Sequence, residues 1–350
     1  MGNPYTCVGL LHCPSRLQGQ CEGLDSWDGQ KVGFPTHAFY IGGQSLLKAG
    51  NLRHKCCILL CSRIMSLELK YVFSGHESFP CKTLWLKKGY DFIEKKGNFN
   101  AVNAVVDLGV GKNMVSSIRY WMKSFGLYAD DDLTAISKYL LDSNSGKDPY
   151  IEDLGTLWIF HYLLVRTGEA SLYHLFFTRF QKERKLFERQ HLINFIKREM
   201  MERGKLKQYN ENTVKKDVAV LLQNYVLPSK AQVMDDYSSL LIDLELIRTA
   251  DGKNYAFNYE GKRQIPLEVL LYAILCEKGE ENTIPYDILH YVAMIFCLND
   301  MEMIAKIQEI QDKYPNHLRY SDVAGMRQLH ILQKIDVKSV LDIYYNHETV

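Results

Sequence analysis

The sequence has no long hydrophobic run and almost no net charge. None of its apolar stretches reaches the roughly 18 residues of a membrane-spanning helix, and no basic segment followed by an apolar one marks a secretion signal at the N-terminus. Lys and Arg number 42 and Asp and Glu 41, a formal net charge of +1. We therefore expect a globular cytoplasmic protein, in which any binding of nucleic acid depends on local clusters of cations.

Cysteine is scarce after residue 65, where only Cys81, Cys276 and Cys297 occur. The first 64 residues hold the other six, together with nine glycines, and show no sustained helical or strand period. A zinc module is the alternative for this segment, but no Cys-x2-Cys or His-x3-5-His pair supports it. We interpret residues 1–64 as a non-native or disordered extension and expect the natural chain to start at Met65.

Familiar enzyme motifs are also missing. His-Glu-x-x-His and Gly-x-Ser-x-Gly do not occur, and GVGK at 109–112 lacks the spacing of a phosphate-binding loop. The adjacent His76 and Glu77 could act as a general base and a carboxylate in phosphodiester cleavage, with Lys82 and Arg119 stabilising the developing charge. Alternatively His76 bonds a backbone carbonyl and Glu77 caps the following helix. Whether the chain is an enzyme stays open.

Residues 101–127 have the pattern of a helix-turn-helix, with a short apolar helix, a break that contains glycine, and a second amphipathic helix. In the second helix, Met114, Ile118, Met122 and Phe125 recur on one face, which predicts a buried stripe. The face expected to point outward has no carboxylate and can donate hydrogen bonds to DNA; its residues are Lys112, Asn113, Ser116, Ser117, Arg119, Tyr120 and Lys123. An ordinary helical hairpin with a basic surface is the alternative.

The segment 179–207 is locally basic. It holds ten Lys and Arg against four Glu, a balance of +6. A second amphipathic helix follows, with Lys215 and Lys216 outward, and Asp251-Gly252 between strand-like runs predicts a hairpin. These elements together favour a winged helix, although a helical linker with a solvated charged face fits the charges equally well.

The remaining pattern predicts a mainly α protein. The nearly apolar LGTLWIFHYLLV is expected to be the central helix of the N-terminal core, with His161 as a hydrogen-bonded core histidine. We expect helical modules that contain one or two winged helix-turn-helix units with a small β-hairpin wing. The expected divisions are 1–64, an N-terminal helix-turn-helix domain at 65–178, a basic helix with a second winged-helix-like unit at 179–260, and a C-terminal helical domain at 261–350.

Four segments resemble the family of bacterial proteins defined by domain of unknown function 4007. They are FSGHESFPCKTLWLKKGYDFI, LGVGKNMVSSIRYWMK, GTLWIFHYLLV, and the stretch from NENTVKKDV to YSDVAGMRQLHI. The likeness runs from about residue 70 to the C-terminus and excludes the first 64 residues. Its pattern is carried by Gly75, His76, Glu77, Trp85, Trp158 and His161. Where such families typically have Arg, this chain has Lys82, which keeps a phosphate contact without bidentate geometry.

The resemblance implies a place in bacterial cassettes that install sulfur in the DNA backbone and defend against phage. Such proteins occur beside cysteine desulfurases and reductase-like sulfur-transfer enzymes, and the SspB-like branch is associated with strand nicking. The expected partners are therefore DNA and other proteins of the cassette, without a membrane. Nicking would call for Mg²⁺ or Mn²⁺, and otherwise no cofactor is expected.

The leading hypothesis is a DNA-binding protein of such a system with nicking activity. The alternatives are a non-catalytic DNA-binding adaptor or transcriptional regulator, and a protein-interaction scaffold. The candidate catalytic residues are His76 and Glu77. The candidate DNA contacts are Lys82, Lys112, Asn113, Ser116, Ser117, Arg119, Lys123, Lys215 and Lys216.

Overall fold

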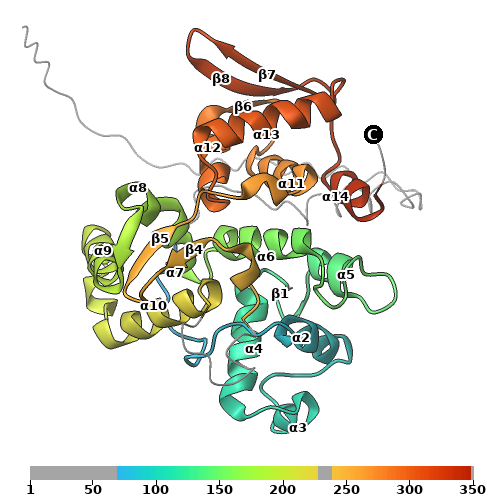
Figure 1. Cartoon of the computed structure of the whole chain (residues 1–350). Helices are drawn as coiled ribbons and strands as arrows, with labels where there is room; N and C mark the ends of the chain where they lie inside the picture. The colour runs from blue at the N-terminus through green and yellow to red at the C-terminus, as the bar shows by residue number, and fades with distance from the viewer. Residues whose placement is uncertain (1–68, 228–238, 348–350) are drawn as a thin grey trace, which may run out of the picture. The chain divides into compact units, whose positions relative to one another are not determined.

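The computed structural model describes residues 69–227 and 239–347, so the predictions for residues 1–64 lie outside the described residues. Helices dominate, joined by three small antiparallel sheets (Figure 1), which confirms the mainly α fold. No single described helix is long and apolar enough to cross a membrane. Among the described helices, the consecutive pair α12 (Tyr286–Ile295) and α13 (Asp300–Lys313) is long and apolar enough only when taken together, and it is bent by 108°.

The predicted helix pair at 101–127 is confirmed. The chain forms α2 (Trp85–Glu94), α3 (Ala104–Leu108) and α4 (Lys112–Ser124). A short hairpin follows, in which each strand has two residues, β1 (Tyr128–Ala129) and β2 (Asp132–Leu133). Helix α3 ends at Gly109, whose left-handed φ of 61° suits glycine. In and after α4, Ile118, Met122 and Phe125 are buried as the period predicts, whereas Met114 is half-buried.

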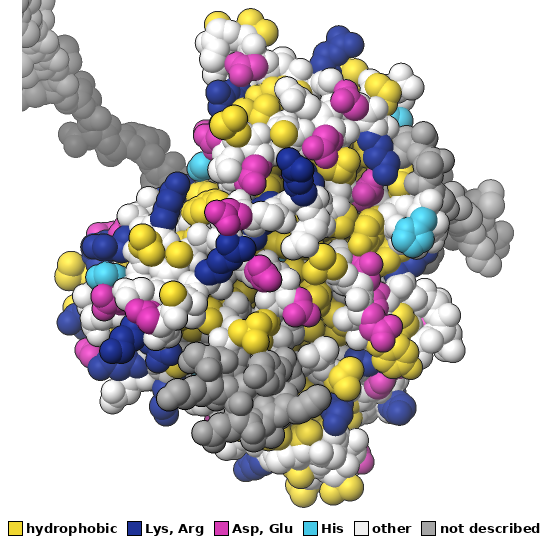
Figure 2. Space-filling view, viewed as in Figure 1, with side chains coloured by type: hydrophobic (Ala, Val, Ile, Leu, Met, Phe, Trp, Pro, Cys, Tyr) yellow, Lys and Arg dark blue, Asp and Glu magenta, His cyan; other side chains and the backbone are white. Residues whose placement is uncertain are grey.

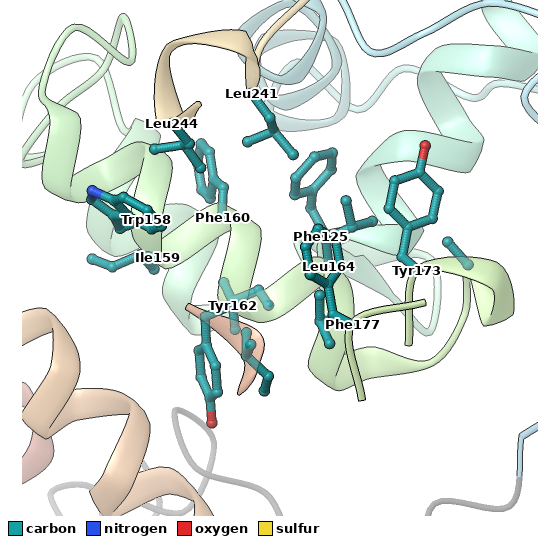
Figure 3. Close-up of a cluster of buried hydrophobic side chains, with 14 of the residues drawn as sticks. Phe125, Trp158, Ile159, Phe160, Tyr162, Leu164, Tyr173, Phe177, Leu241 and Leu244 are labelled. Atoms are coloured by element: carbon teal, nitrogen blue, oxygen red, sulfur yellow. The ribbon is translucent and has the colours of Figure 1, made fainter. Parts of the chain in front are cut away.

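Helix α6 (Leu154–Thr167) follows α5 (Ala135–Leu141) and is the predicted central helix. Asp153 caps its N-terminus by accepting the backbone N–H of Thr156. Figure 3 shows its side chains among the residue that follows α4, two residues between 171 and 180, and two residues near 242. The labelled residues are Phe125, Trp158, Ile159, Phe160, Tyr162, Leu164, Tyr173, Phe177, Leu241 and Leu244. All of them are buried, so α6 organises the core around it.

His161 is the hydrogen-bonded core histidine that the sequence predicts. Its Nδ1 lies 2.8 Å from the Tyr225 hydroxyl and its Nε2 lies 2.7 Å from the carbonyl oxygen of Ile295. Burial lowers the pKa of His161 to about 3, since the charged imidazolium would lose its water. The side chain is therefore neutral at pH 7.

The middle of the chain combines helices with a three-stranded sheet. The helices are α7 (Ser171–Leu175), the π-helical η1 (Phe176–Phe180), α8 (Gln181–Glu183), α9 (Arg189–Glu202), η2 (Leu206–Gln208), α10 (Glu211–Tyr225), η4 (Ile242–Leu244) and η5 (Lys262–Gln264). Strands β3 (Leu186–Glu188), β4 (Ile247–Thr249) and β5 (Asn254–Phe257) pair in the order β3-β5-β4. The predicted Asp251-Gly252 hairpin is confirmed, with Asp251 accepting the N–H groups of Lys253 and Asn254.

The C-terminal part contains a second three-stranded sheet. Its helices are α11 (Leu267–Glu277), α12 (Tyr286–Ile295), α13 (Asp300–Lys313) and α14 (Val337–Tyr345), and its strands are β6 (Thr283–Pro285), β7 (Leu318–Val323) and β8 (Met326–Ile331), in the order β6-β8-β7. The C-terminal helical domain expected at 261–350 therefore also contains a sheet, which the sequence analysis did not predict. Its hairpin turns at Ala324-Gly325, both with positive φ, a pair that is a weaker sequence signal than Asp-Gly.

The last helix returns to the N-terminal helices. Tyr344 of α14 donates a hydrogen bond to Asp153, the residue that caps α6, at 2.8 Å. The hydroxyl oxygens of Tyr345 and of Thr156 on α6 lie 2.7 Å apart. The Tyr139 hydroxyl on α5 donates a hydrogen bond to Asp342 Oδ1 at 2.9 Å. Helix α6 also packs on α4 and α11. The N-terminal and C-terminal helices therefore share contacts around α6.

Candidate nucleic-acid interface

A loop at residues 73–79 connects α4 with α10. The backbone N–H of Ser74 donates to Asp217 Oδ1 on α10 at 2.9 Å, and His76 Nε2 lies 2.6 Å from the same oxygen. On the other side, Ser117 of α4 donates to the carbonyl oxygen of His76 at 3.1 Å. Two helices that the sequence separates by about a hundred residues are thereby held against one short loop.

Both ring nitrogens of His76 are occupied. Nδ1 accepts the backbone N–H of Ser78 at 3.0 Å, so the ring proton lies on Nε2 and is donated to Asp217. The residue is 3% exposed. In this arrangement His76 links structural elements and presents no ring nitrogen to solvent. Its partner is a carboxylate distant in sequence, not the backbone carbonyl of the alternative interpretation.

Glu77 differs from its neighbour because its side chain is exposed. It has a positive φ of 48° within the loop. The alternative in which Glu77 caps the following helix is wrong, since α2 begins only at Trp85 with Leu84 in the capping position. His76 and Glu77 therefore point into different surroundings, one into the protein and one outward.

Gly75 allows the loop to approach α4 closely. Its φ is 105°, and a Cβ atom at this position would lie 2.6 Å from Cδ2 of Tyr120. The Tyr120 ring also packs edge-on against His76, and the indole N–H of Trp121 donates to the carbonyl oxygen of Phe79 at 3.2 Å. This geometry explains why glycine occupies this position of the family motif.

On α4, the expected outward face is found in part. Lys112, Asn113 and Ser116 are exposed. Arg119 is half-buried and donates to Asn100 at 2.8 Å, while the Lys123 ammonium lies 5.7 Å from the centre of the Tyr128 ring. The prediction that Ser117 faces outward is wrong. It is fully buried because the loop at 73–79, which the helical period could not place, covers it.

On α10, Lys215 and Lys216 are exposed as expected. Lys215 pairs with Glu211 one turn earlier, at 2.7 Å. Lys216 directly precedes the buried Asp217, as Ser116 precedes the buried Ser117 on α4, so two exposed polar residues flank the same loop. Lys82 is half-buried and forms a β-bridge with Ser239.

The basic segment 179–207 lies on α8, β3, α9 and the turn that follows. Figure 2 shows Lys and Arg gathered over α8 and α9, interspersed with acidic side chains. Glu199 pairs with Arg179 at 2.6 Å, and Glu183 pairs with Arg198. Seven exposed cations of this segment form no ion pair with another described residue: Lys182, Arg184, Lys185, Arg189, Lys197, Arg203 and Lys207. The surface is therefore positive, but less so than the sequence count suggests.

An open cavity of about 580 Å³ lies between α2 and α3. Its lining includes Lys87, Lys88, Lys95, Asp91 and Asp107. Lys87 is buried; its ammonium donates to the carbonyl oxygen of Leu141 and to the Ser143 hydroxyl and forms an ion pair with Asp91. His76 and Glu77 are not part of this lining. The cavity places carboxylates and lysines together beside α2 and α3.

Two solved structures have a similar fold. The SspB crystal structure superposes on this chain with a TM-score of 0.68 and 24% sequence identity. The magnesium ion-bound SspB crystal structure superposes with a TM-score of 0.67 and 25% identity. Each match covers 79% of the present chain and 88% of the SspB chain. In residues 69–227 and 239–347 of the present chain, no three His, Cys, Asp or Glu side chains lie together so as to hold a metal ion. The described residues thus provide no such set of ligands for magnesium.

No curated protein matches the chain. The family described as "Protein of unknown function (DUF4007)" matches residues 73–345, which include the loop at 73–79, α4, α10 and α14. The match begins beyond the first 64 residues, as the resemblance in the sequence does. The chain belongs to the DUF4007 family.

Proposed function

We propose that the chain binds DNA as part of a bacterial DNA sulfur-modification and phage-defence system. The observation that carries the proposal is the order of elements from α7 to β5. A helical segment, β3, α9, α10 and the hairpin β4–β5 follow one another, with the first strand paired to the last. This is the order of a winged helix, in which the second helix of the pair enters a DNA groove and the hairpin is the wing.

Helix α10 has suitable chemistry for the groove-binding role. Asn212, Lys216 and Gln223 are exposed on it beside Lys215, and they can donate to phosphates and to base edges. Arg203 and Lys207 lie in the turn just before α10 and add positive charge there. Cations near a helix that enters a groove contribute sequence-independent affinity for the DNA backbone.

Helix α4 is the second proposed DNA-binding element. Lys112, Asn113 and Ser116 are exposed on it, and the loop at 73–79 ties it to α10. We assign His76 the role of a positioning residue that sets the spacing of the two helices. A protein with two linked DNA-binding helices contacts a longer stretch of duplex than either helix alone.

The sulfur-modification context rests on family membership and on the SspB-like fold. Other proteins of the cassette are the expected partners. A non-catalytic DNA-binding adaptor or a transcriptional regulator is the alternative within the same binding chemistry, because neither requires a reacting centre.

The test of DNA binding is a salt titration with a labelled duplex. The logarithm of the binding constant should fall linearly with the logarithm of the salt concentration, since phosphate contacts release counterions. Replacing both Lys112 and Lys216 by Ala should weaken binding and flatten this slope. Lys334→Ala, which removes an exposed cation after β8, is the matched control. A flat response in the unmodified chain would contradict the proposal and favour a scaffold.

Nicking is the second candidate function, favoured by the cavity between α2 and α3. Carboxylates and lysines in one cavity are groups that phosphodiester hydrolysis uses. Mg²⁺ or Mn²⁺, the ions expected from the sequence, would need DNA phosphates as further ligands, because the described residues supply no set of three. The assay is relaxation of supercoiled plasmid with either ion. Asp107→Asn and Lys88→Ala should abolish relaxation at the cavity, whereas His76→Ala and Glu77→Ala test the pair expected from the sequence. If all four variants relax the plasmid as well as the unmodified chain does, neither the cavity nor the His76–Glu77 pair is the nicking site. If the unmodified chain does not relax the plasmid, the non-catalytic adaptor is favoured.

A further inference from the structure

Three segments of the chain line the cavity between α2 and α3. They are α2 with its flanking residues, the end of α3, and the loop before α6, which contributes Tyr150. The cavity volume of about 580 Å³ lies within the range of small-molecule sites, roughly 300–1,000 Å³. The cavity is therefore large enough to take a small ligand as a whole.

Helix α2 and its two capping residues contribute a stripe along one face. Leu84, Lys88, Asp91 and Lys95 follow one another at the spacing of a helical face, and all four line the cavity. Lys88 and Lys95 are both exposed. The ordinary helical rise separates them by about 10 Å along the axis. Two cations on one face of a helix thus reach the same cavity.

The two carboxylates of the lining already have partners. Asp91 pairs with the buried Lys87 at 2.8 Å, and Asp107 accepts a hydrogen bond from Asn103 Nδ2 at 2.7 Å. The two exposed lysines of the stripe form no ion pair with another described residue. Since the lining holds three Lys against two Asp, an excess of positive charge remains for an anionic ligand.

Tyr150 offers an aromatic ring to the cavity. Its side chain is 59% exposed, and its ring contacts no other aromatic ring among residues 69–227 and 239–347. The Lys87 ammonium lies over this ring, 5.8 Å from its centre. Leu84, which is 58% exposed, adds apolar surface to the same lining. An exposed tyrosine of this kind is a surface on which a flat ring can stack.

A nucleotide combines the two features that this lining can bind. Its base is a flat ring that stacks on tyrosine, and its phosphate is an anion that pairs with lysine. Inorganic phosphate would leave the apolar part of the lining uncovered, and a neutral aromatic compound would leave the lysines without a partner. The combination of an aromatic ring with unpaired cations therefore selects a ligand that is both planar and anionic.

We propose that this cavity binds a nucleotide, with the base on the Tyr150 ring and the phosphate paired with Lys88 and Lys95. A free nucleotide and a nucleotide that has left the base stack of a DNA strand share this chemistry. The second source deepens the nicking proposal, because it names the unit of the strand that enters the cavity, and for that source the inference rests on the proposed DNA binding. Binding of a free nucleotide requires neither DNA binding nor nicking.

The first experiment is a calorimetric titration of the full chain with dAMP. EDTA is present, so that no metal-dependent cleavage takes place. Deoxyadenosine and inorganic phosphate are the ligand controls, and dAMP should bind about fivefold or more tightly than either, since base and phosphate both contribute. Inorganic phosphate that binds as tightly as dAMP would overturn the proposal, because the base would then have no role.

The variants test the ring and the cations separately. Tyr150→Ala should weaken dAMP binding by about tenfold, and Tyr150→Phe should preserve it because the ring remains. Lys88→Glu combined with Lys95→Glu should weaken it by about tenfold or more. Lys96→Glu combined with Lys334→Glu is the matched control, since both lysines are exposed, neither lines the cavity and the change of charge is the same. All substituted side chains are exposed, so the variants should fold, which circular dichroism checks.

The second experiment distinguishes the two sources of the nucleotide. It compares, again in EDTA, the affinities for a labelled duplex with one unpaired adenine and for the fully paired duplex. A nucleotide from DNA predicts that Tyr150→Ala weakens binding of the first duplex by about fivefold or more and leaves binding of the second unchanged. An effect of Tyr150→Ala on dAMP alone assigns the cavity to free nucleotides.

The two experiments also separate this inference from the proposed function. If Tyr150→Ala changes the affinity for neither dAMP nor the duplex with the unpaired adenine, while the paired duplex still binds, the nucleotide site is overturned and DNA binding stands. If dAMP binds as described and no duplex binds, the nucleotide site stands and the DNA-binding proposal fails.

Discussion

His76 illustrates how a single residue can connect distant parts of a chain. It accepts from its own loop, donates to Asp217, which is 141 positions away, and offers its carbonyl oxygen to Ser117. Buried polar groups that are fully hydrogen-bonded in this way specify one arrangement, because removing any partner leaves another unsatisfied. Residues around His76 therefore set the geometry of α4 and α10.

Gly75→Ala should destabilise the protein. The left-handed φ of 105° and the 2.6 Å approach to Tyr120 leave no room for a methyl group, so we expect a loss of about 1–3 kcal/mol in the free energy of unfolding. Urea unfolding followed by circular dichroism measures this loss. Gly111→Ala is the control, because Gly111 has a negative φ of −66° and open space around its Cβ position. Equal losses in both variants would contradict the expectation.

His161 should make the protein less stable in acid. Its pKa is about 3 in the folded protein against an ordinary value of 6.5, so the unfolded chain takes up the proton more readily. This contribution to stability is fully present above pH 6.5 and is lost as the pH falls toward 3, by up to about 1.4 kcal/mol per pH unit. Urea unfolding between pH 7 and pH 4 measures it. His161→Gln should show a shallower fall with pH, and an identical slope would contradict the assignment.

Among the helices and strands, local sequence patterns correctly predicted those elements whose formation depends on residues close in sequence. The α3–α4 pair, the apolar helix α6 and the Asp251-Gly252 hairpin follow from period and turn chemistry. The burial of Ser117 did not, because the loop that covers it comes from residues 73–79. The β7–β8 hairpin was missed since its strands are largely polar and its Ala-Gly turn is a weak signal.

The two lysines of α10 should contribute unequally to DNA binding. Lys216→Ala should lower the slope of log K against log salt by about one, as expected for one lost phosphate contact. Lys215→Ala should lower it less, because Glu211 already neutralises Lys215. The measurement is anisotropy of a labelled duplex at several salt concentrations. Equal slopes in the two variants would show that the Glu211 pair does not matter.

At the scale of the whole molecule, α6 receives contacts from both ends of the described chain. Helices α4 and α11 pack on it, and α14 bonds its first turn through Tyr344 and Tyr345. Sequence periodicity identified α6 as a core helix but not its C-terminal partners, since these contacts join residues about 190 positions apart. The candidate site has the same origin, because its loop meets α4 and α10 only in the folded chain.

Tyr344→Phe should weaken the whole fold. The substitution removes the hydrogen bond to Asp153 but keeps the ring, so we expect a loss of about 0.5–1.5 kcal/mol in the free energy of unfolding. Urea unfolding gives the value. Tyr150→Phe, at an exposed tyrosine, should change it by less than about 0.5 kcal/mol. No difference between the two variants would show that α14 contributes nothing through this bond.

The return of α14 to α6 has a consequence for the protein during its synthesis. A ribosome adds roughly 5–20 residues per second, so α6 leaves it on the order of ten seconds before α14 exists. During that interval the first turn of α6 lacks its tyrosine partners. The N-terminal helices should therefore reach their final packing only once α14 has left the ribosome, and chains that stop before α14 should be preferred substrates for cellular proteases.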